Sequence, residues 1–262
     1  MISIVIPAHN EEKRIGSTLE AYGKFFSEKK KHEKLDWEII IVINNTQDKT
    51  PEIVKKYSKK YKEIRAIELK QGGKGFAIIE GFKESLKNKK ADMIGFADAD
   101  MATSPEAFYD LAKNIGEYDG IIASRYIKGA SVRPKQSFQR IIASRIFNML
   151  IFSMFLMPYK DTQCGAKIFK REAIENVISH LGITQWAFDV DLLYNLRKMG
   201  FRIKEHPTVW ADKEYSKINF TKAGPRMALS VVRLRMLNSC IEPLLRPLKP
   251  LAKLGDRLIN KS

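Results

Sequence analysis

The chain has 262 residues, of which 44% are hydrophobic and 10% aromatic, a composition that indicates a folded domain with a buried core and excludes a disordered chain. The formal net charge of +16 points to an anionic partner such as nucleic acid, anionic lipid or a phosphorylated substrate. Two cysteines, Cys164 and Cys240, are too few for a disulfide framework or a Cys-rich zinc site.

Short apolar runs alternate with helical patterns in the first half of the chain. The expected strands are Ile2–Ile6, Glu38–Ile43, Ile64–Leu69, Met93–Ala97 and Asp119–Ala123. The expected helices are Asn10–Phe26, Thr50–Tyr61 and Gly75–Leu86. This alternation predicts an α/β fold with a mostly parallel sheet flanked by helices. Ligands of such sheets bind beyond the carboxyl ends of the strands, so we expect the functional site there.

Polar or glycine-rich segments follow each of these strands. Asp98 and Asp100 follow the fourth strand, and two carboxylates at this spacing suit Mg²⁺ or Mn²⁺, which prefer oxygen ligands. Taken alone, this motif is more simply explained as an acidic turn without a metal. The segments Pro7–Glu12, Asn44–Thr50 and Gly72–Gly75 are expected at the same rim, however. Together they favour a site for a metal ion and a nucleotide.

These motifs resemble those of the inverting glycosyltransferases of family two, and within it the dolichyl-phosphate mannosyl- and glucosyltransferases. The resemblance covers residues 1–220 and is also carried by Ser124-Arg125-Tyr126, Asp161–Gly165 and Trp186–Asp191. It implies a GT-A-type catalytic domain with a nucleotide-sugar half at 1–125 and an acceptor half at 126–220. It implies transfer of glucose or mannose from UDP-glucose or GDP-mannose to a polyprenyl (dolichyl) phosphate, with inversion.

The resemblance also implies roles for individual positions. The nucleotide-sugar site would comprise Pro7, Asn10, Glu11, Asn44, Lys74 and Asp98, with Mg²⁺ or Mn²⁺ on Asp98 and Asp100. The acceptor phosphate would meet Arg125, Arg140, Ser144, Ser216 and Lys217. The residues implied in catalysis are Asp100, Asp189, Arg125 and Arg140. Because a phosphate monoester is largely dianionic near neutral pH, the reaction needs no strong base, and Asp189 is expected to orient the sugar or an arginine.

One departure from the family concerns Asn44 and Asn45, which stand where the family usually has two aspartates. An asparagine donates as well as accepts hydrogen bonds and carries no charge. The identity of the nucleotide therefore stays open. So do two alternatives: a weak or inactive relative that binds nucleotide sugars or membranes, and a transferase to a saccharide hydroxyl.

Residues 221–262 are predicted to form a basic amphipathic segment. From residue 213 onward the chain has eleven Lys and Arg residues against three Asp and Glu residues. Such segments bind anionic membrane surfaces, although packing against the domain is the other interpretation. The run Ile146–Met157 is likewise either a core helix or a helix in the membrane interface. With neither a signal peptide nor a spanning helix, we expect peripheral attachment at the cytoplasmic face of a membrane and no nucleic-acid partner.

Overall fold

The computed structural model describes residues 1–134, 138–182, 187–211 and 220–238, and within them the chain is built on a seven-stranded sheet. In spatial order the strands are β3 (Ile64–Leu69), β2 (Trp37–Asn44), β1 (Ile2–Ala8), β4 (Met93–Ala97), β7 (Ala166–Lys170), β5 (Gly120–Ser124) and β8 (Ile203–Pro207). All are parallel except β7, which lies antiparallel between β4 and β5. The reversed β7 therefore brings its amino end to the rim where β1, β2 and β4 end.

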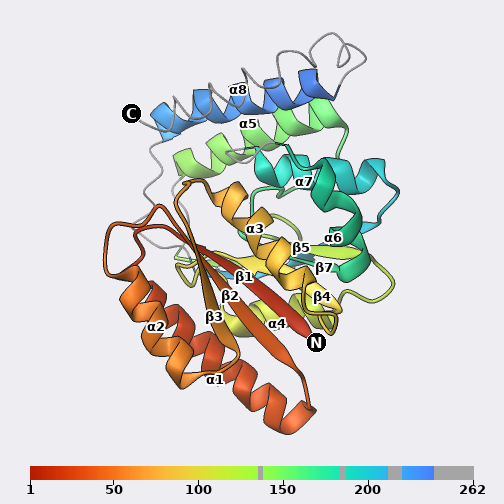
Figure 1. The fold of residues 1–262 in the computed structure, drawn as a ribbon. Coiled ribbons are helices and arrows are strands. Elements are labelled where there is room, and N and C mark those ends of the chain that lie inside the picture. Colours follow the sequence, from red (N-terminus) through yellow and green to blue (C-terminus); the bar gives the residue numbers. More distant parts are fainter. Residues whose placement is uncertain (135–137, 183–186, 212–219, 239–262) are drawn as a thin grey trace.

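Helices cover both faces of this sheet (Figure 1). One face packs against α1 (Ile15–Glu33), α2 (Thr50–Lys60) and α4 (Pro105–Lys113). The other face packs against α3 (Lys74–Leu86), α6 (Arg171–Val177) and α7 (Phe188–Lys198). Neighbouring residues of β1 serve opposite faces, because Ile4 and Ile6 join the α1 side and Val5 joins the α3 side. Strands buried on both faces read as continuous apolar runs, which is why they were predictable from the sequence.

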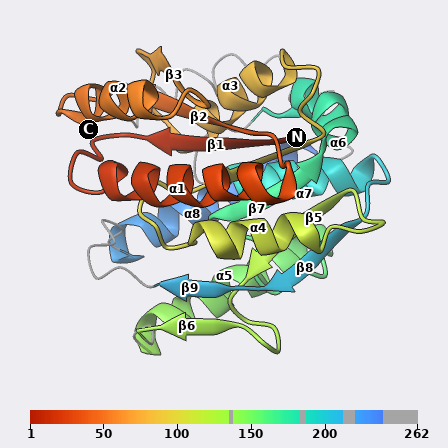
Figure 2. The ribbon, with the colours of Figure 1, turned by 90° about the horizontal axis from the view of Figure 1, so that it is seen from below.

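A second, smaller sheet pairs β6 (Ser131–Arg133) with β9 (Val209–Ala211). Figure 2 shows this pair at one side of the molecule, beyond α4. It is tied to the loop after β4, since Ala211 N–H donates to Ala102 O at 2.9 Å and Thr103 pairs with Trp210. The small sheet thus links the acidic turn after β4 to β9, in the last part of the sheet-forming chain.

Two long helices form an outer layer over α7 (Figure 1). They are α5 (Phe138–Phe155) and α8 (Phe220–Leu237), which pack against each other. The inner side of α8 is apolar, with Val231 fully buried and Leu234 almost so. The first part of the predicted basic segment is therefore a helix that packs against α5 and the core, and residues 239–262 lie outside the described residues. Across the described residues, the helices are too short or too polar to traverse a lipid bilayer.

The five expected strands are confirmed, but the first helix differs from its expected start. It begins at Ile15 instead of Asn10 and continues to Glu33. Asn10 has a φ of 54°, a left-handed conformation that interrupts a helix. The segment from Asn10 to Arg14 is instead a turn that closes with Arg14 N–H donating to Glu11 O at 2.9 Å.

Candidate active site

The loops after β1 and β2 are joined by hydrogen bonds that hold the rim of the sheet in place. Glu11 N–H donates to Thr50 Oγ1 at 2.8 Å, and Glu12 N–H donates to Asp48 Oδ2 at 3.0 Å. Burial opposes ionisation of Asp48, but hydrogen bonds from the Thr50 hydroxyl and from backbone N–H groups lower its pKa below the ordinary value. The predicted nucleoside residues Pro7, Asn10, Glu11 and Asn44 therefore converge at one place, as expected of strand ends.

Asn44 is buried at the end of β2 and bridges two neighbouring loops. With its amide oriented to suit both neighbours, Nδ2 donates to Ala8 O at 3.0 Å and Oδ1 accepts from Gly73 N–H at 3.2 Å. An aspartate cannot supply the first of these bonds, because a carboxylate only accepts. These two hydrogen bonds explain why an asparagine occupies position 44 in this chain. Its role as a nucleoside ligand stays a prediction.

Asp98 follows β4 and lies between Lys74 and Gly165. The Lys74 ammonium, at the first turn of α3, forms an ion pair with its carboxylate. A Cβ on Gly165 would come within 1.9 Å of Asp98 Oδ2, so the carboxylate occupies space that only a glycine leaves open. Burial disfavours the charged amine, but Asp98, Asp189 and Asp100 outweigh it and raise the pKa of Lys74 above its ordinary value.

Asp100 lies two residues further on, in a turn whose next residue, Met101, has a φ of 61°. Ala102 N–H donates to Asp100 Oδ1 at 3.0 Å, and Thr18 and Tyr22 of α1 hold the turn through the carbonyls of Ala99 and Thr103. Burial and the negative charge of Asp98 raise the pKa of Asp100.

A divalent cation suits this pair of carboxylates, because it would relieve the repulsion that they experience without it. The described residues offer no third acidic, His or Cys ligand nearby, so phosphate oxygens and water would complete the coordination. The residues present therefore fit a Mg²⁺ or Mn²⁺ ion that binds together with a diphosphate.

Asp189 lies in the first turn of α7 and is paired with a lysine that the sequence did not single out. Lys167 of β7 is fully buried, and its Nζ lies 2.5 Å from Asp189 Oδ1 and 2.7 Å from Cys164 O. Asp189 was predicted to orient the sugar or an arginine, and in the structure its partner is this ammonium. The neighbouring Asp191 accepts from Gly182 N–H at 3.0 Å and Asn195 Nδ2 at 2.7 Å, which indicates a structural role.

Arg125 follows β5 and is held by a buried carboxylate. The side-chain atoms Nε and Nη2 of Arg125 donate to the two carboxylate oxygens of Asp161 at 2.8 and 2.9 Å. The backbone N–H of Arg125 also donates to Asp161, at 2.9 Å. Burial disfavours the charged guanidinium, but Asp161 outweighs it and raises the pKa of Arg125. This bidentate pair fixes Arg125 before any ligand arrives. Its part in binding an acceptor phosphate stays a prediction.

The remaining predicted acceptor residues begin with Ser144 on α5, which accepts a hydrogen bond from the Tyr126 hydroxyl at 2.8 Å. Arg140 lies one turn earlier on the same helix, as predicted. Arg145 is exposed and places its guanidinium carbon 4.2 Å from the centroid of the Tyr126 ring. Ser216 and Lys217 lie outside the described residues.

The chain is similar to known proteins in sequence and in fold. The family model Glycosyl transferase family 2 matches residues 3–178. A dolichyl-phosphate beta-glucosyltransferase of Dictyostelium discoideum is 34% identical over 244 residues, 89% of this chain and 73% of the relative. The human protein of the same description is 31% identical over 229 residues, 83% of this chain and 69% of the relative.

Among solved structures, a similar one is glucosyl-3-phosphoglycerate synthase of Mycobacterium tuberculosis, in complex with Mn²⁺, uridine diphosphate and phosphoglyceric acid. The TM-score is 0.62 at 17% identity, over 90% of this chain and 77% of the other. This likeness concerns the fold, and it confirms the predicted GT-A-type architecture.

Proposed function

The chain belongs to glycosyl transferase family 2, and on this premise we propose that it transfers glucose from a nucleoside diphosphate sugar to dolichyl phosphate at a membrane surface. Relatives at 34% and 31% identity are dolichyl-phosphate beta-glucosyltransferases. Similarity at this level over most of both chains supports the same reaction class. The proposal of a lipid acceptor rests mainly on the apolar outer surface of α5.

That surface is apolar although it faces solvent. Large apolar side chains more than 40% exposed recur every three or four residues, which puts them on one face of the helix. We call them the α5 stripe: Phe138, Ile142, Ile146, Met149, Phe152 and, just past the helix, Leu156. The opposite face packs into the core through Ile151 and Phe155. The packing of the domain therefore does not account for the outer stripe, whereas contact with lipid does.

Charge on the same layer supports an anionic membrane as the partner. Neither α5 nor α8 contains an acidic residue, while both contain arginines. Exposed Leu229 and Met236 on α8 extend the apolar character of this layer. Ser144, the predicted acceptor contact, lies on α5 itself. A lipid phosphate held near Ser144 could therefore keep its chain against the bilayer.

The proposed reaction uses the residues of the rim as follows. Asp98 and Asp100 would hold the metal ion, which supplies positive charge against the departing nucleoside diphosphate. Lys74 would leave its ion pair with Asp98 and bind the diphosphate of the donor instead. The acceptor phosphate is a nucleophile without a base, so the chain's main task is to orient the two substrates. Direct attack on the anomeric carbon inverts its configuration, and an α-linked donor would give a β-linked product.

The test is turnover of UDP-glucose and GDP-mannose with dolichyl phosphate and Mn²⁺ or Mg²⁺ in lipid vesicles. The expected product is β-linked glucosyl phosphate, identified by its anomeric NMR coupling. Binding of nucleotide sugars without any transfer would instead support an inactive relative. Transfer only to free saccharides would replace the lipid acceptor by a hydroxyl acceptor, and either result would overturn the proposal.

A further inference from the structure

A lysine is an unusual residue for a buried strand, and Lys167 is the second residue of the buried strand β7. It pairs with Phe96 of β4 on one side and with Ile122 of β5 on the other. Its side chain is fully buried. Burial of an ammonium ion is costly unless it is paired and hydrogen-bonded. Lys167 satisfies this requirement through Asp189 and the carbonyl of Cys164.

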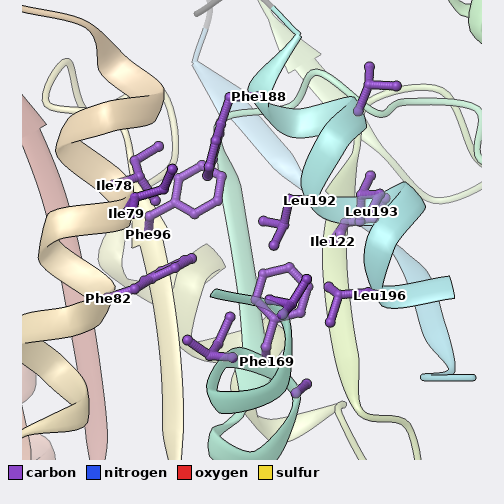
Figure 3. Close-up of a cluster of buried hydrophobic side chains, with 14 of the residues drawn as sticks. Ile78, Ile79, Phe82, Phe96, Ile122, Phe169, Phe188, Leu192, Leu193 and Leu196 are labelled. Atoms are coloured by element: carbon purple, nitrogen blue, oxygen red, sulfur yellow. The ribbon is translucent and has the colours of Figure 1, made fainter. Parts of the chain in front are cut away.

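Buried ion pairs are in general not needed for stability. Replacing a buried ion pair by apolar residues of similar volume is often neutral or stabilising, so retention of the pair calls for another reason. The surroundings of Lys167 are strongly apolar, and Figure 3 shows Phe96, Phe188 and Phe82 close together between α3 and α7. A methionine or leucine could fill the same position against these rings.

The position of the pair relative to the rim supplies that reason. Directly opposed residues of antiparallel strands point to the same face, so Lys167 and Phe96 share the face covered by α3 and α7. The Nζ atoms of Lys167 and Lys74 lie 5.2 and 6.0 Å from the centroid of the Phe96 ring. The two ion pairs, Lys74 with Asp98 and Lys167 with Asp189, therefore meet at this one ring.

We infer that Lys167 is a positioning residue, which holds Asp189 as a fixed anion on the inner wall of the donor site, next to Lys74 and Asp98. The Lys167 side chain is inaccessible to solvent, whereas the Asp189 side chain is 12% exposed, so only the carboxylate of the pair can be reached from outside. Asp189 lies at the amino end of α7, where the helix dipole also favours an anion. Two neighbouring ion pairs, Lys74 with Asp98 and Lys167 with Asp189, thus line this part of the site. This inference rests on the proposed function, because its main consequence is for glycosyl transfer.

The test separates positioning from stability with a double variant. Lys167→Met alone leaves Asp189 without its partner, and we expect the melting temperature to fall by on the order of 10 °C. Lys167→Met with Asp189→Asn removes both charges and is expected to melt near the wild type. The kcat of this double variant should nevertheless be roughly 100-fold below that of the wild type, because the carboxylate that orients the sugar is missing. Lys30→Met with Glu63→Gln removes an ion pair next to the amino end of β3, away from the rim, and should leave kcat unchanged.

A second measurement judges the inference without transfer to lipid. Calorimetric affinity for uridine diphosphate with Mn²⁺ should be the same in the double variant and the wild type, while the added affinity of UDP-glucose over uridine diphosphate should be lost. If the wild type binds donors but glycosylates no lipid phosphate, the proposed function fails, and this comparison still decides whether the Lys167–Asp189 pair acts in the donor site. Full kcat in a stable double variant, or equal loss of affinity for uridine diphosphate, would overturn the inference.

Discussion

Gly165 and Asp98 lie so close together that the acidic turn depends on the absence of a side chain at residue 165. A Cβ there would come within 1.9 Å of Asp98 Oδ2 and 2.5 Å of its Cγ. The backbone holds the two residues in this register, because Asp98 N–H donates to Gly165 O at 3.1 Å. The carboxylate can rotate away from an added methyl group, whereas the backbone cannot easily move.

Gly165→Ala should therefore fold but displace the Asp98 carboxylate from its place beside Asp100. We expect kcat/KM to fall roughly 100-fold, the cost of misplacing a group by about 1 Å, with a change of only a few degrees in melting temperature. Steady-state kinetics and differential scanning calorimetry measure the two effects. Gly182→Ala is the matched control, since a Cβ at that position meets nothing within 4 Å. Unchanged kcat/KM in Gly165→Ala would refute the role given to Asp98.

Asn44→Asp restores the residue usual in the family, and we expect it to destabilise this chain. Its new carboxylate oxygen would face the Ala8 carbonyl at about the present 3.0 Å, two acceptors without a proton between them. Loss of a buried hydrogen bond of this kind costs about 1–3 kcal/mol of unfolding free energy, measurable by urea denaturation. Asn45→Asp, at an exposed neighbouring position with a φ of 46°, should stay within about 0.5 kcal/mol. Equal stability of Asn44→Asp and the wild type would show that Asn44 does not bridge the loops.

Asp100→Asn should stabilise the protein in the absence of metal while removing its response to metal. The pKa of Asp100 is raised by burial and by Asp98, so its ionised form is less favourable in the folded state than in the unfolded chain. The wild type should thus lose stability relative to the variant as the pH rises above the ordinary value of 3.8, through the raised pKa.

The measurement is the melting temperature in a chelator at pH 4 and pH 7. A rise of a few degrees in Asp100→Asn is expected at pH 7 and a smaller one at pH 4, since about 1 kcal/mol shifts the melting temperature by roughly 2 °C in a chain of this size. Mn²⁺ with uridine diphosphate should raise the melting temperature of the wild type alone. Equal stabilisation of both proteins by Mn²⁺ would contradict a metal site at Asp100.

The sequence predicted those features that depend on neighbouring residues. Continuous apolar strands and the polar segments after them placed Asp98, Asp100 and Lys74 at one rim, because parallel strands end at the same edge. It could not identify partners that are distant in the chain. Asp161 is 36 residues from Arg125, and Asp189 is 22 residues from Lys167. Arg145 is exposed, and nothing in the local pattern places it over Tyr126.

The α5 stripe gives the last prediction, which concerns the membrane. Ile146, Met149 and Phe152 are each more than half exposed, and burying such a side chain in lipid contributes about 1 kcal/mol even when insertion is partial. Changing all three to Ser in the full chain should lower the partition coefficient onto vesicles that contain anionic lipid roughly 100-fold, because each 1.4 kcal/mol is a factor of about ten. Vesicle sedimentation measures this, with circular dichroism to confirm folding. Val209→Ser, which changes an exposed apolar side chain on β9, serves as the control and should bind like the wild type. If the triple variant binds vesicles like the wild type, the stripe is not the membrane contact. If the variant loses both vesicle binding and transfer to dolichyl phosphate but keeps its affinity for the donor, the stripe delivers the acceptor.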